Sequence, residues 1–189
     1  MRAFVAIPLP DVFGSWLAVQ RPVLVALSDS LRVVPPASGH ITLRFLGDLS
    51  AVDLSSVMER LRTSLASQTG TTLVLSRLGA FYRQGYPSIL WVGPASIPAE
   101  MQALASAVTT VLTGLGSNRR LEPFMPHVTI ARFNGHGPKP SLPLLLPPVQ
   151  PLVVPVSKVV LYESVLGTGT PTYIPQGAVE LAGFVEGKD

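Results

Sequence analysis

The sequence predicts an α+β fold in which antiparallel β-sheets pack with a few helices. Segments with strand-like and helix-like patterns follow one another without the strict alternation that a parallel sheet needs. Hydrophobic residues make up 47% of the 189 residues, which is enough to bury a core and excludes a disordered chain. The 16 glycines and 19 prolines exclude a long helical bundle or coiled coil, because both residue types interrupt helices.

The first quarter of the chain is predicted to form three extended segments and one helix. Residues 2–8 (RAFVAIP) are a short run of β-branched, aromatic and small apolar side chains, typical of a buried strand. Residues 11–27 are predicted to form a helix that has its first residue, an aspartate, as N-cap and is kinked or split at Pro22. Residues 31–34 and 40–46 (HITLRFL) favour extended structure. The face that the helix 11–27 would bury consists of Phe13, Trp16, Leu17, Leu24 and Leu27.

The middle of the chain is predicted to have two helices with a β-region between them. Residues 71–77 and 88–92 are the predicted strands, and the turn-rich residues 79–87 join them. The helix before this β-region is predicted to begin at Asp53 and to end at Ser67. The helix after it is predicted to begin near Ser96 and to end at the glycines that follow its apolar stripe. The apolar stripe of the earlier helix consists of Leu54, Val57, Met58, Leu61 and Leu65.

The last third of the chain is predicted to be extended or irregular. Residues 127–133, 153–162 and 173–181 are predicted strands, the last two joined by a turn at 167–171. Residues 135–151 are rich in proline, which indicates a semi-rigid surface loop; a ligand for a proline-recognising domain is the less favoured interpretation. Both halves of the chain run strand, helix, strand, so we interpret it as one domain with an internal duplication.

The composition narrows the function. The chain has no cysteine, which excludes disulfides, thiolate metal sites, iron–sulfur clusters and a cysteine nucleophile. The formal charge is only +3, but most of the 14 basic residues are arginines, so nucleic acid or nucleotides are as plausible as a basic surface without a ligand. Prolines interrupt or closely follow the apolar runs 3–7 and 142–156, so we expect a cytoplasmic protein with no membrane partner.

Two tetrapeptides far apart in the chain share one pattern. Residues 40–43 (HITL) and 127–130 (HVTI) each consist of a histidine, a β-branched residue, a threonine and an aliphatic residue. Side chains alternate across a strand, so each histidine shares a face with the threonine two residues on, Thr42 or Thr129, while the apolar residues point into a core. If a duplicated fold places the two strands side by side, two imidazoles and two hydroxyls face one cleft.

This pairing suits the hydrolysis of a phosphodiester. His40 and His127 can divide the proton transfers: one imidazole takes a proton from the attacking water, and the other protonates the departing ribose oxygen. The threonine hydroxyls can hold the charge that builds on the phosphoryl oxygens. The residues alone do not decide which histidine is the acid.

Other interpretations of the histidines are less favoured. A lone histidine on a strand is more often structural, but a matched pair favours a site. A zinc site needs a third ligand, and neither motif has an Asp, Glu or Cys at ligand spacing, so we expect no metal. His136 is interpreted as a solvated loop residue. The chain has no P-loop, dinucleotide-binding or Gly-x-Ser-x-Gly pattern, so no cofactor is expected.

The two motifs are part of a longer series that ends before Tyr173: residues 2–8, 40–47, 90–93, 126–132 and 161–164. With this series the chain resembles the two-histidine phosphoesterase superfamily, and within it the bacterial and archaeal RNA 2′,3′-cyclic phosphodiesterases, also called 2′-5′ RNA ligases. The resemblance implies two pseudo-symmetric lobes, each a small antiparallel sheet with flanking helices, around a central cleft. Residues 1–189 would then form a single bilobal domain.

The resemblance also implies a reaction and a role for each residue. The chain would hydrolyse the 2′,3′-cyclic phosphate at an RNA end to a 2′-phosphate without metal, with His40 as the proton donor and His127 as the acceptor. Thr42 and Thr129 would bind the phosphate. Arg132 matches a family position, although strict alternation sends it to the opposite face from the histidine unless a bulge intervenes.

Three more side chains have open roles. Arg44 shares the face of the first histidine by parity, and it could steer the RNA backbone or be a solvated charge. Phe45 and Phe124 could stack on a base, but core packing is favoured for both. A 2′-5′ RNA ligase and a non-catalytic nucleotide- or RNA-binding module are the rival functions. We expect a monomer whose partner is RNA or a nucleotide with a 2′,3′-cyclic phosphate end.

Overall fold

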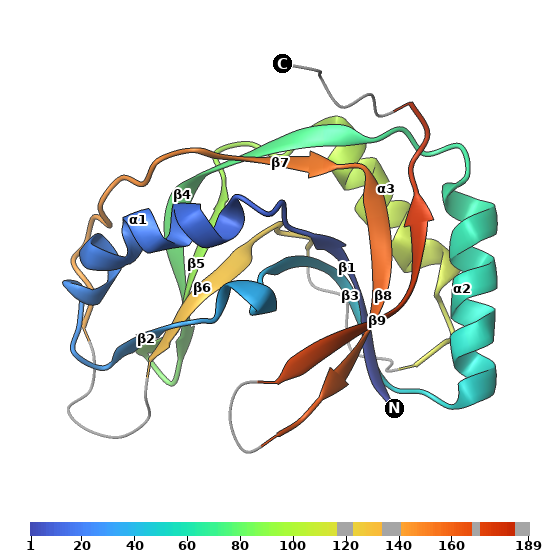
Figure 1. The fold of residues 1–189 in the computed structure, drawn as a ribbon, viewed down its shortest axis with the longest axis horizontal. Coiled ribbons are helices and arrows are strands. Elements are labelled where there is room, and N and C mark those ends of the chain that lie inside the picture. The colour runs from blue at the N-terminus through green and yellow to red at the C-terminus, as the bar shows by residue number, and fades with distance from the viewer. Residues whose placement is uncertain (117–122, 134–140, 168–170, 184–189) are drawn as a thin grey trace.

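The computed structural model describes residues 1–116, 123–133, 141–167 and 171–183, which form two antiparallel sheets curved around the middle of the molecule (Figure 1). The four-stranded sheet has the order β3 (His40–Asp48), β1 (Arg2–Pro8), β8 (Lys158–Val165) and β9 (Thr172–Glu180). The five-stranded sheet has the order β2 (Leu31–Val33), β6 (Val128–Phe133), β5 (Tyr86–Pro94), β4 (Thr71–Arg83) and β7 (Leu152–Val156). This architecture confirms the predicted α+β fold with antiparallel sheets.

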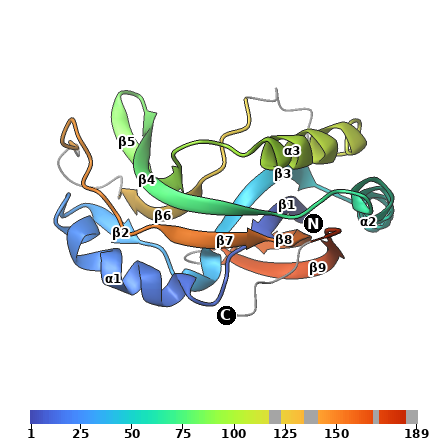
Figure 2. The same cartoon turned by 90° about the horizontal axis from the view of Figure 1, so that it is seen from above.

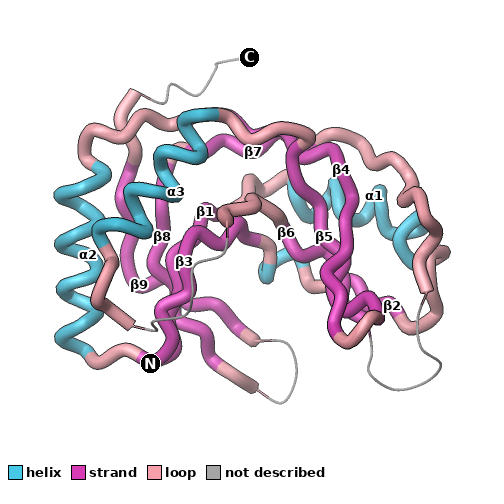
Figure 3. Tube along the Cα trace, turned by 180° about the vertical axis from the view of Figure 1, so that it is seen from behind, coloured by secondary structure: helices cyan, strands magenta, loops and turns pink. Residues whose placement is uncertain are grey.

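Each sheet takes strands from both halves of the chain. In the four-stranded sheet, β1 and β3 come from the first half of the chain, and β8 and β9 come from its last part. The first helix, α1 (Phe13–Val25), lies between β1 and β2 in the sequence and packs on β2 of the five-stranded sheet. The helices α2 (Ala51–Leu65) and α3 (Ala99–Val111) lie side by side on the outer face of the four-stranded sheet, against β9 and β3 (Figures 2 and 3). The chain therefore ties the two lobes together several times.

The core lies between the sheets and their helices. All side chains of β1 from Ala3 to Ile7 are buried, and Val5 and Ile7 belong to the same hydrophobic core as the buried residues of α2 and α3. The start of α2 has a cap that the apolar pattern does not reveal: the Ser50 hydroxyl oxygen accepts from the Asp53 amide at 3.2 Å, and the Asp53 carboxylate accepts from the Ser50 amide at 3.1 Å. Reciprocal bonds of this kind fix where a helix begins.

The β-hairpin in the middle of the chain differs from the prediction. Residues 79–87, expected to be a long turn region, belong mostly to β4 and β5, which pair up to Arg83 and Tyr86. The turn itself is only Gln84 and Gly85, with φ of 51° and 81°. Positive φ at both positions matches the right-handed twist of a two-residue hairpin, so the strands continue to the turn without splaying.

Two other elements also differ from the prediction. The predicted strand 153–162 is two strands in different sheets, because the chain leaves β7 at the edge of one sheet and enters β8 in the other. The first helix begins at Phe13 with no side-chain cap, so the expected capping by Asp11 is wrong, and the helix runs unbroken through Pro22. Its burial of four apolar side chains outweighs the hydrogen bond that proline removes.

Candidate active site

A cavity of about 600 Å³ lies between the two sheets and is lined from both. Five of the six predicted site residues line it: His40, Thr42, His127, Thr129 and Arg132. The first two belong to β3 of the four-stranded sheet, and the last two belong to β6 of the five-stranded sheet, just after His127. The fold therefore brings the two distant tetrapeptides to one cavity.

The two imidazoles are held in the same way. The Nδ1 of His40 lies 2.8 Å from the carbonyl oxygen of Ser38, and the Nδ1 of His127 lies 2.9 Å from that of Met125. A carbonyl oxygen only accepts hydrogen bonds, so Nδ1 carries a proton in both rings whatever their charge. In each neutral ring Nε2 is then the free base, and in each cation it is the second acid.

Aromatic side chains surround both imidazoles. Tyr173 meets the ring of His40 edge-on at a centroid distance of 4.9 Å, and Phe4 lies 4.8 Å from the same ring. Phe81 meets the ring of His127 edge-on at 4.8 Å. These rings pack against the imidazoles and keep water away from part of each.

The environment favours the neutral form of both histidines. Burial lowers the pKa of His40 below its ordinary value; the charges of His127 and Arg132 lower this pKa further, and the hydrogen bond to Ser38 opposes the fall. Burial also lowers the pKa of His127, again opposed by its backbone hydrogen bond. The protein groups alone therefore give the site less positive charge than its residues suggest, and an anion between the rings would stabilise their protonated forms.

In both strands the alternation of side chains between the two faces reverses three residues after the histidine. In β3 the pairing with β1 skips Leu43, and in β6 the pairing with β5 skips Ile130. Each skipped residue is a bulge, and a bulge reverses the alternation that follows it. The fifth residue after each histidine, Phe45 or Arg132, therefore faces the cavity. The bulge explains how Arg132 lines the cavity despite its odd spacing.

The same bulge makes the prediction for Arg44 wrong. This side chain is only 8% exposed, does not line the cavity, and donates from Nη1 to the carbonyl oxygen of Thr109 in α3 at 2.8 Å. Burial lowers the pKa of its guanidinium. Arg44 links β3 to the helix layer, on the face opposite His40.

The two phenylalanines have different environments, and the bulge in β3 explains that of Phe45. Phe45 is 61% exposed and lines the cavity, so its expected core packing is wrong. Phe124 is partly buried against the core, which confirms the expectation for that residue. Among the side chains that the sequence argument missed, Phe4 and Arg2 share the cavity face of β1 by simple alternation, whereas Phe81 was hidden in the region interpreted as a turn.

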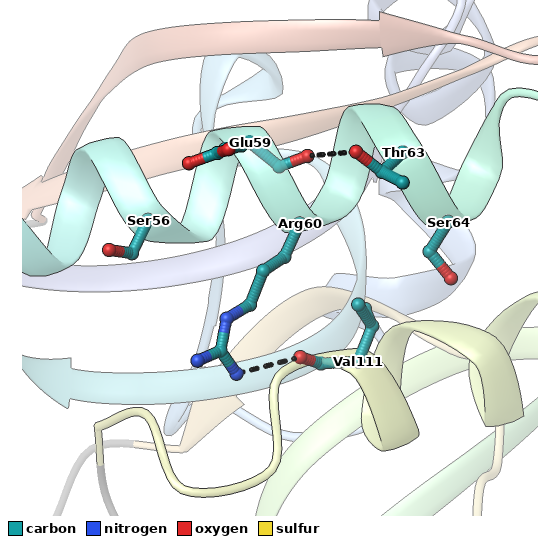
Figure 4. A pocket seen from close by; sticks show the side chains of 6 residues that line it. All are labelled: Ser56, Glu59, Arg60, Thr63, Ser64 and Val111. Carbon is teal, nitrogen blue, oxygen red and sulfur yellow. Dashed lines mark hydrogen bonds between the residues drawn. The ribbon is translucent and has the colours of Figure 1, made fainter.

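Other features of the described chain bear on cofactors and alternative sites. No group of three His, Asp or Glu side chains that could hold a metal ion occurs among the described residues, and His136 lies outside them. No described helix is long and apolar enough to cross a membrane. A second hollow, of about 580 Å³, lies between α2 and α3 (Figure 4), where Arg60 donates to the carbonyl oxygen of Val111 at 3.3 Å. None of the predicted site residues lines this hollow.

The two curved sheets and the paired histidine motifs at one cavity define a protein of the two-histidine phosphoesterase class. The family model of the 2′-5′ RNA ligase superfamily matches residues 14–168. The chain belongs to this superfamily, as its resemblance predicted.

Individual relatives agree with this assignment. The RNA 2′,3′-cyclic phosphodiesterase of Aeropyrum pernix is 33% identical over 146 residues, covering 76% of this chain and 82% of the relative. That of Archaeoglobus fulgidus is 33% identical over 141 residues, covering 74% and 76%. The crystal structure of E. coli LigT in apo form is similar with a TM-score of 0.76 and 27% identity, covering 95% of this chain and 96% of LigT. The complex of LigT with 3′-AMP gives a TM-score of 0.74 at 25% identity, covering 96% and 98%.

Proposed function

We propose that this chain hydrolyses 2′,3′-cyclic phosphates at RNA ends to 2′-phosphates by paired histidine catalysis. The observation that carries the proposal is the cavity in which two imidazoles present free Nε2 atoms beside two threonines and an arginine. The relatives that share the family are named RNA 2′,3′-cyclic phosphodiesterases, which gives the substrate class.

The proposed reaction has two proton transfers, one from the attacking water to a histidine and one from the other histidine to the leaving oxygen. Neutral His127 takes a proton at Nε2 from a water whose oxygen attacks phosphorus. The bond from phosphorus to the ribose 3′ oxygen breaks, and protonated His40 gives its Nε2 proton to that oxygen. The products are a 2′-phosphomonoester and a 3′-hydroxyl. Thr42, Thr129 and Arg132 would donate to the phosphoryl oxygens as their charge grows.

Binding of the substrate phosphate itself favours the protonated form of His40 that acts as the acid. Burial and, to a smaller extent, the charge of Arg132 lower the pKa of His40, which disfavours the protonated form that the reaction needs. A phosphodiester anion neutralises the guanidinium charge and stabilises the imidazolium beside it, so substrate binding raises the pKa of His40. Phe45, exposed at the cavity wall, offers its ring to the terminal base.

The overall reaction is tested with an oligonucleotide that ends in a 2′,3′-cyclic phosphate and with EDTA present. We expect conversion to the 2′-phosphate at an unchanged rate, because the two imidazoles supply both proton transfers. Hydrolysis that the chelator abolishes, or no hydrolysis, would contradict the proposal. Light scattering on the same sample checks the expected monomer.

The separate histidine roles are tested with a leaving group that needs no proton. His40→Ala and His127→Ala should each lower kcat by at least about 10²-fold on the normal substrate. When sulfur replaces the 3′ oxygen, the departing thiolate is stable without protonation. His40→Ala should then recover most of its rate relative to wild type, and His127→Ala should not. The opposite pattern of rescue would exchange the two roles.

A further inference from the structure

The cavity extends beyond the space that one phosphate occupies. Along β1 its wall has three levels, because Ala6 pairs with Thr42, Phe4 pairs with Phe45, and Arg2 lies two residues further. Successive levels are two residues apart, or about 7 Å at the usual rise of a strand. The level of Thr42 belongs to the phosphate site, and the level of Arg2 lies about 13 Å from it, four residues along β1.

Arg2 lies on the cavity side of β1. The pairing of β1 with β8 is regular from Ala3 to Ala6, so alternation along β1 holds, and Arg2 shares a face with Phe4. The ring of Phe4 in turn contacts the imidazole of His40 at 4.8 Å. Arg2 itself is exposed and is one of the residues that line the cavity.

The charge of Arg2 has no partner within the part of the chain that the structure describes. No hydrogen bond or ion pair involves its guanidinium there, although Asp48 is its cross-strand neighbour. Among the described residues that line the cavity, none is an Asp or Glu. The end of the cavity away from the histidines therefore has a free cation with five donors, a group well suited to a phosphate.

We propose that Arg2 binds an internal phosphate of the RNA, upstream of the nucleotide that carries the cyclic phosphate. The inference rests on the proposed function. With the cyclic phosphate between the histidines and the terminal base against Phe45, the strand continues on its 5′ side toward Arg2. A nucleoside 2′,3′-cyclic phosphate has no internal phosphate and leaves this position empty. Arg2 thus makes the site prefer RNA ends over single nucleosides.

The test compares two substrates with the same reacting end. One is adenosine 2′,3′-cyclic phosphate, and the other is a trinucleotide that ends in it. Arg2→Gln should lower kcat/KM for the trinucleotide by about 3- to 10-fold, mainly through KM, and leave the nucleoside within about 2-fold of wild type. Arg2→Lys should retain most of the trinucleotide activity, because it keeps the charge.

The matched control is Arg62→Gln, which removes the same charge from the exposed surface of α2 and should change neither substrate. The slope of log kcat/KM for the trinucleotide against log salt should weaken by about 0.7 in Arg2→Gln and not in the control. Equal effects on both substrates, or no effect on either, would overturn the role of Arg2 while the proposed function stands. If the wild-type protein hydrolysed neither substrate, the proposed function would fail and this inference with it.

Discussion

Replacing Gly79 by alanine tests the packing beneath one of the imidazoles. Gly79 in β4 pairs with Trp91 in β5, and a Cβ at this glycine would lie 2.5 Å from Cε2 of the indole and closer still to two other ring atoms. The backbone at Gly79 does not have the positive φ that disfavours alanine, so the ring is the obstacle. Trp91 lies 6.2 Å from the imidazole of His127 and 5.7 Å from the ring of Phe81, so it cannot move alone.

The expected cost follows from two opposing terms. Overpacking a rigid aromatic contact costs about 1 to 3 kcal/mol. Alanine also restricts the unfolded chain, which returns at most about 1 kcal/mol. We therefore expect Gly79→Ala to lower the free energy of unfolding by about 1 to 2 kcal/mol in urea denaturation. We also expect kcat to fall, because the indole that must shift lies near the ring of Phe81 and the imidazole of His127.

The control for this variant is Gly14→Ala in the helix α1. Its new Cβ would meet Pro36 at 3.6 Å, an ordinary contact. Alanine is a better helix former than glycine, by at most about 1 kcal/mol and by less in the first turn, where Gly14 lies. The control should raise the free energy of unfolding and leave kcat unchanged. The packing argument is refuted if Gly79→Ala unfolds at the wild-type urea concentration with wild-type kcat.

Four further predictions concern the histidines and the bulged strands. Burial lowers the pKa of both His40 and His127, so the bell-shaped profile of kcat/KM against pH should be centred below 6.5, and an optimum above pH 7 would contradict this. Because the two pKa values are lower in the folded state than in the unfolded state, the unfolded state binds more protons in acid. The free energy of unfolding should therefore fall as the pH drops below about 6.5. This fall should be less steep in a variant in which both histidines are replaced by asparagine. Arg44→Met should keep kcat and lie within about 1 kcal/mol of wild-type stability, because an apolar chain of similar length fills the same buried space. A large loss of kcat in Arg44→Met would restore the role in RNA binding that the structure argues against. Phe45→Leu should raise KM for adenosine 2′,3′-cyclic phosphate by about 5- to 10-fold, the value of one lost base stack, and an unchanged KM would exclude the stacking.

The sequence predicted the elements that have a strong period of their own. The apolar stripe from Leu54 to Leu65 predicted α2 within two residues of its observed ends, and the β-branched run 2–8 predicted β1. The errors lie where long-range pairing decides. Nothing in the run 153–162 indicates that β7 and β8 pair with β4 and β1 in different sheets. The hairpin extends to Gln84 because its two strands pair, although its Gly, Tyr and Pro residues are typical of turns.

The candidate site was predictable as far as alternation along a strand holds. Spacing by two predicted that Thr42 and Thr129 share the cavity with the histidines, which both do. Alternation fails after each threonine, because Leu43 and Ile130 are bulged and no local pattern marks a bulge. Strict alternation predicted that Arg44 shares the cavity face, and core packing was favoured for Phe45; the structure exchanges the two.

We propose that the two motifs descend from a duplication, because they share details beyond their residue pattern. A histidine alone needs neither a carbonyl acceptor two residues before it nor a bulge three residues after it, yet both motifs have both. We infer that one ancestral half already had the carbonyl acceptor, the histidine and the bulge. The two halves then diverged at the fifth residue after the histidine, which the bulge turns toward the cavity. One half has Phe45 there, which suits a base, and the other has Arg132, which suits a phosphate. By this proposal, one unit of the pair came to suit the base of an RNA end and the other its phosphate.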